Sequence, residues 1–377
     1  MRIPSLFLTP LLAVTGFLVP FGGAQDRLEP AAGAGADAFP DGIEPLVRGP
    51  VHEAYAQPID FSPGPGPAVP KPPPAPIPEA PPEMQPEGDN IQWIPGYWAW
   101  DPEAGQFRWV SGVYRDAPPG REWVPGRWTY TDDGWVWVPG FWADARSQEL
   151  PYVPQPPDSL DMGPSVPPPD DNSFYVPGVW LYRDTRFVWR PGFWAACRPD
   201  SIWIPARYLW TPGGYVYCSG YRDYPIERRG LAFAPVRFQR ALWNDPRWAY
   251  RPGYVVRPSV FTDALFVNRG HYYFGNYYAR AGFQPWWDAS RLDPHTAYYR
   301  WQHRDNPNWS RDLKALYVER AARRDVEDAL AQLAGAGPLV GAADVDVALL
   351  RGRERRAAGG AVRRHDERPL HAGAQVD

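Results

Sequence analysis

The chain has 377 residues, a formal net charge of −4, 49 prolines, 35 glycines and 20 tryptophans. Proline at this density predicts long stretches without packed structure, whereas the tryptophans predict cores or platforms built from large rings. No segment after the first 24 residues is apolar enough to span a membrane, so we expect no transmembrane span in the mature chain.

Residues 1–24 are expected to be a secretory signal peptide. Arg2 supplies a positive start, an apolar run extends from Leu6 to Val19, and small residues at 22–24 precede a cut at Gln25. An uncleaved anchor is the alternative. The sequence therefore predicts an exported protein of the periplasm, the cell envelope or the extracellular space.

Residues 25–90 form a proline-rich, acidic segment with 11 acidic and 3 basic residues. The stretch "SPGPGPAVPKPPPAPIPEAPPEMQPEG" has no hydrophobic period. Its proline density favours extended polyproline II, so a disordered linker or stalk is predicted here.

An aromatic unit of the type W-x-P-G-x-W recurs eight times between residues 91 and 222. Alternate connections carry turn residues such as "TDDG", flanked by aromatics at a period of two, which is a hairpin signal. Proline cannot donate in a sheet and glycine tolerates irregular backbone, so each Pro-Gly pair predicts a bend. The units begin at Trp93, Trp109, Trp123, Trp137, Tyr175, Trp189, Trp203 and Tyr217.

The register of these hairpins predicts an all-β fold of tandem antiparallel meanders. Extending it from one hairpin to the next places Tyr114 opposite Trp123 and Trp194 opposite Trp203. Two four-stranded blocks result, 91–142 and 174–222, separated by a proline-rich insert at 143–173. Two rows of rings follow, which are candidates either for the core or for a stacking surface: Trp98, Trp109, Trp128 and Trp137, and Trp180, Trp189, Tyr208 and Tyr217.

Residues 91–222 resemble bacterial exported proteins that carry the YXWGXW or WXXGXW repeat after a signal peptide and a proline-rich segment. Tyr114, Ala206 and Arg222 depart from the repeat pattern. The resemblance implies no established activity, catalytic residue or cofactor.

Residues 223–305 are predicted to be a basic, β-rich module. Residues 223–310 hold 12 arginines and 7 acidic residues, and short strands flank a turn at Arg269-Gly270. Helical spacing predicts a helix over 306–336 that starts near Asn308. A disordered tail is expected over 337–377.

Two cysteines, Cys197 and Cys218, lie in the second block, and in an exported protein such a pair is expected to form a disulfide. His271, His295 and His303 lie near Asp293 and Asp305, but their spacing matches no metal-ligand pattern. No metal site and no cofactor are expected.

The sequence contains no phosphate-binding loop, nucleophile elbow or zinc-protease motif. We therefore expect a non-enzymatic structural or adhesive protein of the cell envelope or surface. One alternative is a module that binds polysaccharide or peptidoglycan through exposed Trp and Tyr rings, and another is an uncharacterised enzyme within 223–305. Cell-wall polymer or polysaccharide is the expected partner class. Nucleic acid is not expected, and self-association along sheet edges is left open.

Overall fold

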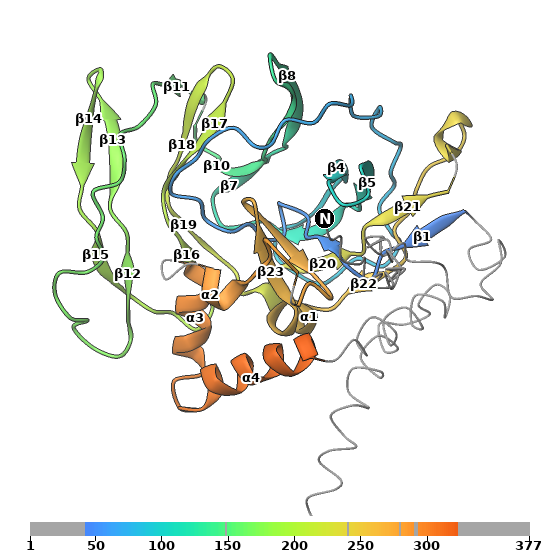
Figure 1. Ribbon diagram of the computed structural model, residues 1–377. Helices are drawn as coiled ribbons and strands as arrows, with labels where there is room; N and C mark the ends of the chain where they lie inside the picture. Colours follow the sequence, from blue (N-terminus) through green and yellow to red (C-terminus); the bar gives the residue numbers. More distant parts are fainter. Residues whose placement is uncertain (1–41, 148, 240, 279, 290–292, 323–377) are drawn as a thin grey trace, which may run out of the picture. The chain divides into compact units, whose positions relative to one another are not determined.

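The computed structural model describes residues 42–322, except 148, 240, 279 and 290–292 (Figure 1). The predicted signal peptide and tail lie outside these residues, as does the predicted helix beyond residue 322. The all-β class is confirmed, since most elements are short antiparallel strands. In the described part of the chain, no helix has the length and apolar character needed to cross a membrane.

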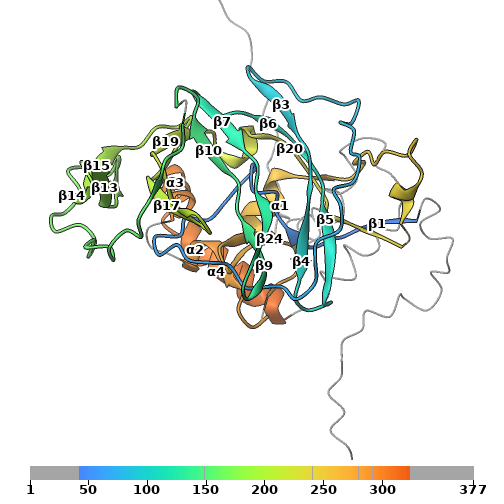
Figure 2. The same cartoon turned by 90° about the horizontal axis from the view of Figure 1, so that it is seen from above.

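The eight aromatic units fold as four bent antiparallel hairpins, each made of two consecutive units (Figures 1 and 2). Hairpin I consists of β3 (Ile91–Ile94), β4 (Tyr97–Asp101), β5 (Gln106–Val110) and β6 (Val113–Asp116). Hairpin II consists of β7 (Arg121–Val124), β8 (Arg127–Thr131), β9 (Gly134–Val138) and β10 (Phe141–Asp144). Hairpin III consists of β12 (Ser173–Val176), β13 (Val179–Arg183), β14 (Arg186–Arg190) and β15 (Phe193–Ala196). Hairpin IV consists of β16 (Ile202–Ile204), β17 (Arg207–Thr211), β18 (Gly214–Cys218) and β19 (Tyr221–Asp223).

The predicted register is confirmed within each hairpin. The inner pairs face one another as expected: Trp98 with Trp109, Trp128 with Trp137, Trp180 with Trp189, and Tyr208 with Tyr217.

The predicted pairing between neighbouring hairpins is wrong. Tyr114 pairs with Trp93 and, on its other side, with Leu231 of β20 (Gly230–Phe233), while Trp123 pairs with Trp142. In the second block, Trp194 pairs with Tyr175 and Trp203 with Arg222. Each hairpin thus closes on itself, and the edge of hairpin I is completed by a strand from the C-terminal module.

The bend glycines explain the aromatic unit. In hairpin II, a Cβ at Gly126 would overlap the ring of Trp137, and a Cβ at Gly140 would overlap the ring of Trp123. The first ring of a unit therefore lies over the glycine of the opposite unit, except where Ala206 replaces the glycine. The same ring also contacts the second ring of that opposite unit, as Trp137 contacts Trp128 at 5.6 Å between centroids. In the same way, the Trp109 ring lies over Gly96 and the Trp189 ring lies over Gly178.

We predict that Gly126→Ala destabilises the protein by about 1–3 kcal/mol, because the added methyl group displaces the Trp137 ring. Gly64→Ala is the matched control, since a Cβ there has no heavy atom within 4 Å. Chemical denaturation of both variants checks this. Equal unfolding midpoints would contradict the role given to the glycine.

The proline-rich residues from 42 onward are part of the fold, contrary to the disordered linker predicted for 25–90, and the predicted proline-rich insert at 143–173 also packs on the hairpins. We call residues 66–82 strap 1 and residues 152–166 strap 2. Their carbonyl groups accept hydrogen bonds from indole N–H groups: Trp98 donates to Ala75 and Trp180 to Asp158, each at 2.9 Å. Extended proline-rich backbone has carbonyl groups free to accept, which is why these segments pack against tryptophan rings.

The straps also pair with strands. Val69 exchanges two backbone hydrogen bonds with Trp135 of β9, and β11 (Tyr152–Val153) pairs with β18. Upstream of strap 1, β1 (Ile43–Pro45) pairs with β21 (Val236–Phe238), and β2 (Gly49–Pro50) pairs with β24 (His271–Phe274). The N-terminal portion of the described chain is therefore integrated into the sheets.

Carboxylates from the segments that precede the hairpins bind the bends. Glu79 accepts from the Gly96 and Gly112 amides and from the Trp109 indole. Glu53 accepts from the Gly140 amide at 2.8 Å and from the Trp137 indole at 2.7 Å. Asp161 does the same in hairpin III, with the Gly178 amide and the Tyr175 hydroxyl. We call these contacts the carboxylate clasps.

We predict that Glu79→Gln costs about 1.5–3 kcal/mol of stability, the range for hydrogen bonds to charged groups, because one accepting oxygen becomes a donor that faces N–H groups. Glu83→Gln is the control, since Glu83 is exposed in the same proline-rich stretch. Thermal unfolding compares them, and a loss no greater than that of the control would contradict the clasp.

The chain contains the same arrangement twice. Glu79 precedes Gly96 by 17 residues, and Asp161 precedes Gly178 by 17. Trp128 donates to the Trp98 carbonyl at 2.8 Å, and at the equivalent positions Tyr208 donates to the Trp180 carbonyl at 2.9 Å. A strap followed by two hairpins is thus the unit that repeats; the first repeat covers residues 66–144 and the second 152–223.

The C-terminal module mixes strands with helices, which the predicted β-rich module lacked. The predicted turn is confirmed between β23 (Leu265–Asn268) and β24, where Arg269 and Gly270 adopt φ of 47° and 76°. The other strands and α-helices are β22 (Val255–Val256), α1 (Pro258–Asp263), β25 (Gln284–Pro285), α2 (Trp286–Ala289), α3 (Pro294–Gln302) and α4 (Trp309–Ala322), and two short 3-10 helices, η1 (Ile226–Arg228) and η2 (Leu242–Asn244), precede them. The last begins next to the predicted Asn308.

The main core joins this module to the N-terminal residues 51–56. Tyr55, Phe261, Phe266 and Trp286 are each 1% exposed in one cluster. A buried ionic contact adds to it, since Asp223 of hairpin IV binds both Arg115 of hairpin I and Arg229. Such a pair is costly to break because it would leave an uncompensated buried charge.

The expected disulfide is not formed, and both cysteines are free thiols. Cys218 is buried against Phe141 and Leu209, whereas Cys197 follows β15 and lines an open groove beside α3. Burial raises the pKa of the Cys218 thiol to about 11, which keeps it protonated. Cys218 therefore acts as a small apolar core residue.

Candidate functional site

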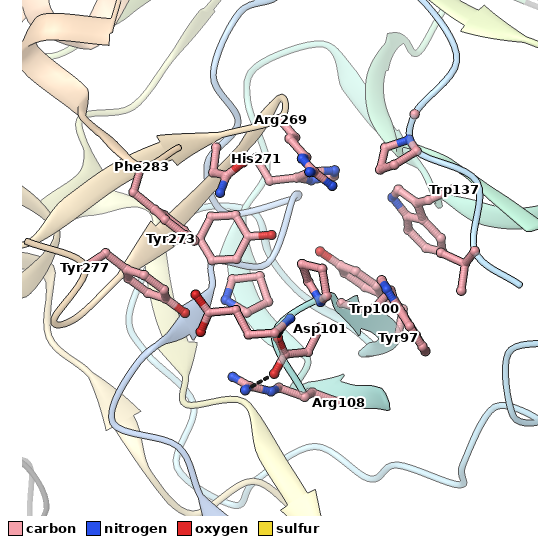
Figure 3. Close-up of a pocket in the computed structure, with 18 of the residues that line it drawn as sticks. Tyr97, Trp100, Asp101, Arg108, Trp137, Arg269, His271, Tyr273, Tyr277 and Phe283 are labelled. Atoms are coloured by element: carbon pink, nitrogen blue, oxygen red, sulfur yellow. Dashed lines mark hydrogen bonds and ion pairs between the residues drawn. The ribbon is translucent and has the colours of Figure 1, made fainter. Parts of the chain in front are cut away.

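A cavity of about 130 Å³ lies between hairpins I and II and the β23–β24 hairpin (Figure 3). Tyr97 and Trp137 form one side and Tyr273 and Tyr277 the other, as Figure 3 shows. His271 and Arg269 lie at one end and the Asp101–Arg108 pair at the other. The cavity thus has two aromatic walls and two polar ends.

The hairpin wall is rigid because the repeat itself holds it. The Tyr97 ring stacks on the Trp137 ring, with 4.8 Å between centroids and 17° between planes. The Trp137 indole donates to Glu53, which is 3% exposed. Ring positions fixed in this way lose little conformational entropy when a ligand binds.

The module wall comes from β24 and the loop that follows it. Tyr277 stacks on Phe283 at 4.1 Å, and the Phe283 ring meets Tyr273 edge to face at 5.1 Å. The left-handed turn at Arg269 directs the chain so that His271 and Tyr273, two residues apart on β24, both line the cavity.

The polar groups of the cavity are of two kinds. Some are already paired: Arg108 with Asp101, Arg280 with Glu103 at 2.6 Å, and His271 Nδ1 with Glu53 Oε1 at 3.3 Å. Burial lowers the pKa of Arg108, which still lies beside a carboxylate.

Other polar groups are available to a ligand. Among the residues that the structure describes, the side-chain amide of Asn268, the Arg269 guanidinium and the Tyr273 hydroxyl have no hydrogen-bond partner. All three line the cavity, so they offer donors and acceptors close to the aromatic walls.

The chemistry of the cavity suits a six-membered ring that carries hydroxyl groups, and its volume limits how far such a ring can enter. At about 130 Å³ the cavity is slightly smaller than an apolar cavity of ~150 Å³ that admits benzene in another protein, so a sugar ring would enter it in part and keep its outer hydroxyls outside. A sugar ring has apolar C–H faces for the aromatic walls and hydroxyls for the polar groups, and convergent polar groups in an aromatic pocket are typical of ligand sites.

The structure divides the predicted ring residues. Trp128 and Trp137 line the cavity, whereas Trp98 and Trp109 are 7% and 1% exposed and lie in a core cluster with Val236 and Tyr250. The four ring residues of the second block also lie in different environments. Trp180 and Trp189 are half-buried, and Tyr208 is 4% exposed. Tyr217 lines a different cavity beside Tyr208. The two predicted rows therefore do not form one continuous platform.

Sequence reasoning missed most of the cavity. Tyr97 occupies the variable position between the bend glycine and the second aromatic, where the repeat gives no reason to select it. Tyr273 and Tyr277 lie in "HYYFGNYY", an aromatic cluster that was visible, but nothing in the sequence brings it to hairpins I and II.

The histidines singled out from the sequence are scattered. His271 lines the cavity, His295 is buried between Arg229 and Tyr272, and His303 stacks on Trp309. Within the described ranges, no three His, Cys, Asp or Glu side chains form a group that could hold a metal ion.

Fold and cavity together define an all-β protein of strapped aromatic hairpins. The family model named WXXGXW repeat matches residues 93–113, 123–143, 174–195 and 198–221. These ranges follow the four hairpins, so the chain carries the WXXGXW repeat and the predicted resemblance is confirmed. No curated protein and no solved structure matches the chain.

His52, next to the clasp residue Glu53, gives a prediction for pH. Its Nε2 donates to the Pro95 carbonyl at 3.1 Å and its Nδ1 accepts from the Ala54 amide at 3.1 Å, so the folded protein needs the neutral ring. Burial lowers the pKa of His52 to about 4. The unfolded ring takes up a proton near pH 6.5, so the unfolded state binds more protons between these values and stability rises with pH.

We expect His52 to contribute about 3 kcal/mol to the rise in unfolding free energy between pH 4 and 6.5. Denaturation at several pH values, compared with His52→Gln, measures this contribution. The variant should show a shallower slope in this window, and an unchanged slope would contradict the assignment.

Proposed function

We propose that the protein is an exported, non-enzymatic module that binds a polysaccharide of the cell envelope, with one sugar ring in the cavity. The observation that carries the proposal is the pair of aromatic walls together with the polar groups of Asn268, Arg269 and Tyr273, which line the cavity and have no hydrogen-bond partner among the described residues. Stacking on the rings supplies affinity, and the polar groups select the orientation of the sugar.

The state of the carboxylates supports binding without hydrolysis. Glycoside hydrolysis needs one carboxylic acid that can donate a proton and a second carboxylate across the scissile bond. Asp101 and Glu103 each form an ion pair with an arginine, Arg108 and Arg280, so both carboxylates are held by contacts within the protein. Neither is suited to the role of general acid.

The N-terminal sequence supports export. The apolar run followed by small residues at 22–24 has the pattern of a secretory signal. An exported protein meets wall polymers and surface glycans, which are the ligands that the cavity favours.

Calorimetry of the mature chain against a panel of soluble glycans and muropeptides tests the proposal. We expect saturable binding to at least one of them. Tyr273→Phe removes one hydroxyl and should weaken that binding by roughly 2- to 10-fold, the range for one hydrogen bond. Arg269→Asn keeps the left-handed turn and should weaken it further, because a hydrogen bond to a charged group is lost.

Tyr130→Phe is the matched control, since Tyr130 is 66% exposed at the tip of hairpin II and does not line the cavity. No binding across the panel would refute the proposed function. Equal affinities for the cavity variants and the control would refute the assignment of the site.

A structural or adhesive role is the second candidate. The burial of Trp98, Trp109 and Tyr208 favours it, because rings used for packing build a rigid scaffold. Two results together would favour this role over sugar binding: no binding to any glycan of the panel, and co-sedimentation of the mature chain with purified envelope.

A further inference from the structure

The two repeats differ in what covers them. In the first repeat, β21 pairs with β5 through Val236 and Trp109, and β20 pairs with β6. The strap is covered as well, since the Ala80 amide donates to the Tyr250 carbonyl and the Tyr250 amide to the Pro78 carbonyl, both at 2.8 Å. Residues 230–238 therefore cover the strand edge of hairpin I, and Tyr250 covers its strap.

The equivalent edge of the second repeat is open. Within the described residues, β14 pairs with β13 alone and β15 pairs with β12 alone. Apart from the Ala196 carbonyl, which accepts from Arg222 at 3.1 Å, these outer edges have no strand beside them, and such an edge is a template for another strand. The views from the side and from above both show hairpin III projecting from the rest of the described chain (Figures 1 and 2).

The side chains of this edge are those of an uncovered interface. Phe193 is 44% exposed, whereas Val113, its equivalent in hairpin I, is 0% exposed. On the strap, Leu160 and Met162 are 58% and 98% exposed at the positions equivalent to Pro78 and Ala80. Val188 on β14 is also 44% exposed. Exposed apolar residues therefore gather on the part of the second repeat that corresponds to the covered part of the first.

A buried nitrogen at the same edge also lacks a partner. The Arg190 Nε atom on β14 is buried and has no hydrogen-bond acceptor among the described residues. The Arg190 guanidinium lies over the Phe193 ring at 5.7 Å, so it packs against the exposed ring of β15.

We propose that β14, β15 and residues 160–162, here called the open face, bind an extended peptide segment of a partner protein by β-strand addition. The first repeat specifies the chemistry of that segment. It resembles residues 230–250: two short apolar strands joined at an Ala-Pro bend, followed by an aromatic segment that pairs with the strap. This interaction is separate from the sugar cavity and does not depend on it.

A labelled synthetic peptide with the sequence of residues 230–250, titrated against the mature full-length chain, tests the proposal by fluorescence anisotropy. We expect saturable binding that a scrambled peptide does not show. Val188→Glu combined with Phe193→Glu should weaken it by at least about tenfold, because charges replace apolar contacts in the centre of the interface.

Val318→Glu is the matched control, since Val318 is 61% exposed on α4 and lies away from the open face. Met162→Glu is a second test variant at a residue too exposed to affect folding. Melting curves of all the variants verify that the fold is intact.

Two results would overturn the proposal. One is binding that the substitutions on the open face leave unchanged, which would mean that the peptide displaces the native strand on hairpin I. The other is self-association of the chain through the open face with no binding of the peptide, which would make a second copy the occupant.

Discussion

The contact between a bend glycine, the ring that lies over it and the carboxylate that binds its amide is the constraint on which the fold depends. A bend in both strands of a hairpin frees backbone amides in the middle of a sheet, and a buried amide must find an acceptor. Glu79, Glu53 and Asp161 supply acceptors from segments that precede the hairpins. The straps are therefore bound at the bends of hairpins I and III, and residue Glu53, upstream of strap 1, is bound at the bend of hairpin II.

The same contact positions the candidate site. Glu53 binds the bend of hairpin II and the Trp137 indole, and its carboxylate also lies beside His271 of the C-terminal module. One buried side chain thus sets the distance between the two aromatic walls. The cavity is the space left where a repeat hairpin and the module hairpin share an anchor, so its shape is fixed before any ligand enters.

Local regularity made much of the fold predictable from the sequence. The aromatic spacing and the turn residues determine the pairing inside each hairpin, and Arg269-Gly270 determines the turn of the module, because such signals act over a few residues. The pairing of β6 with β20 was not predictable, since more than a hundred residues separate the strands and either edge of hairpin I could accept a neighbour. The straps were missed because a proline-rich composition usually indicates disorder, whereas here indole N–H groups donate to the strap carbonyls and hold the straps in place.

For the site, the sequence indicated which aromatic residues are candidates. It could not show which of these rings pack on a bend glycine and which line the cavity.

The covering of hairpin I by residues 230–250 has a consequence for the order of folding. The second repeat finds its strap and both hairpins within residues 152–223, so it can close as soon as that stretch is available. The first repeat waits for strands that follow the second, and the core around Tyr55 waits for Tyr317 of α4. Because closing long loops slows folding, we expect the sheet around hairpin I and the core around Tyr55 to be completed after the second repeat has closed.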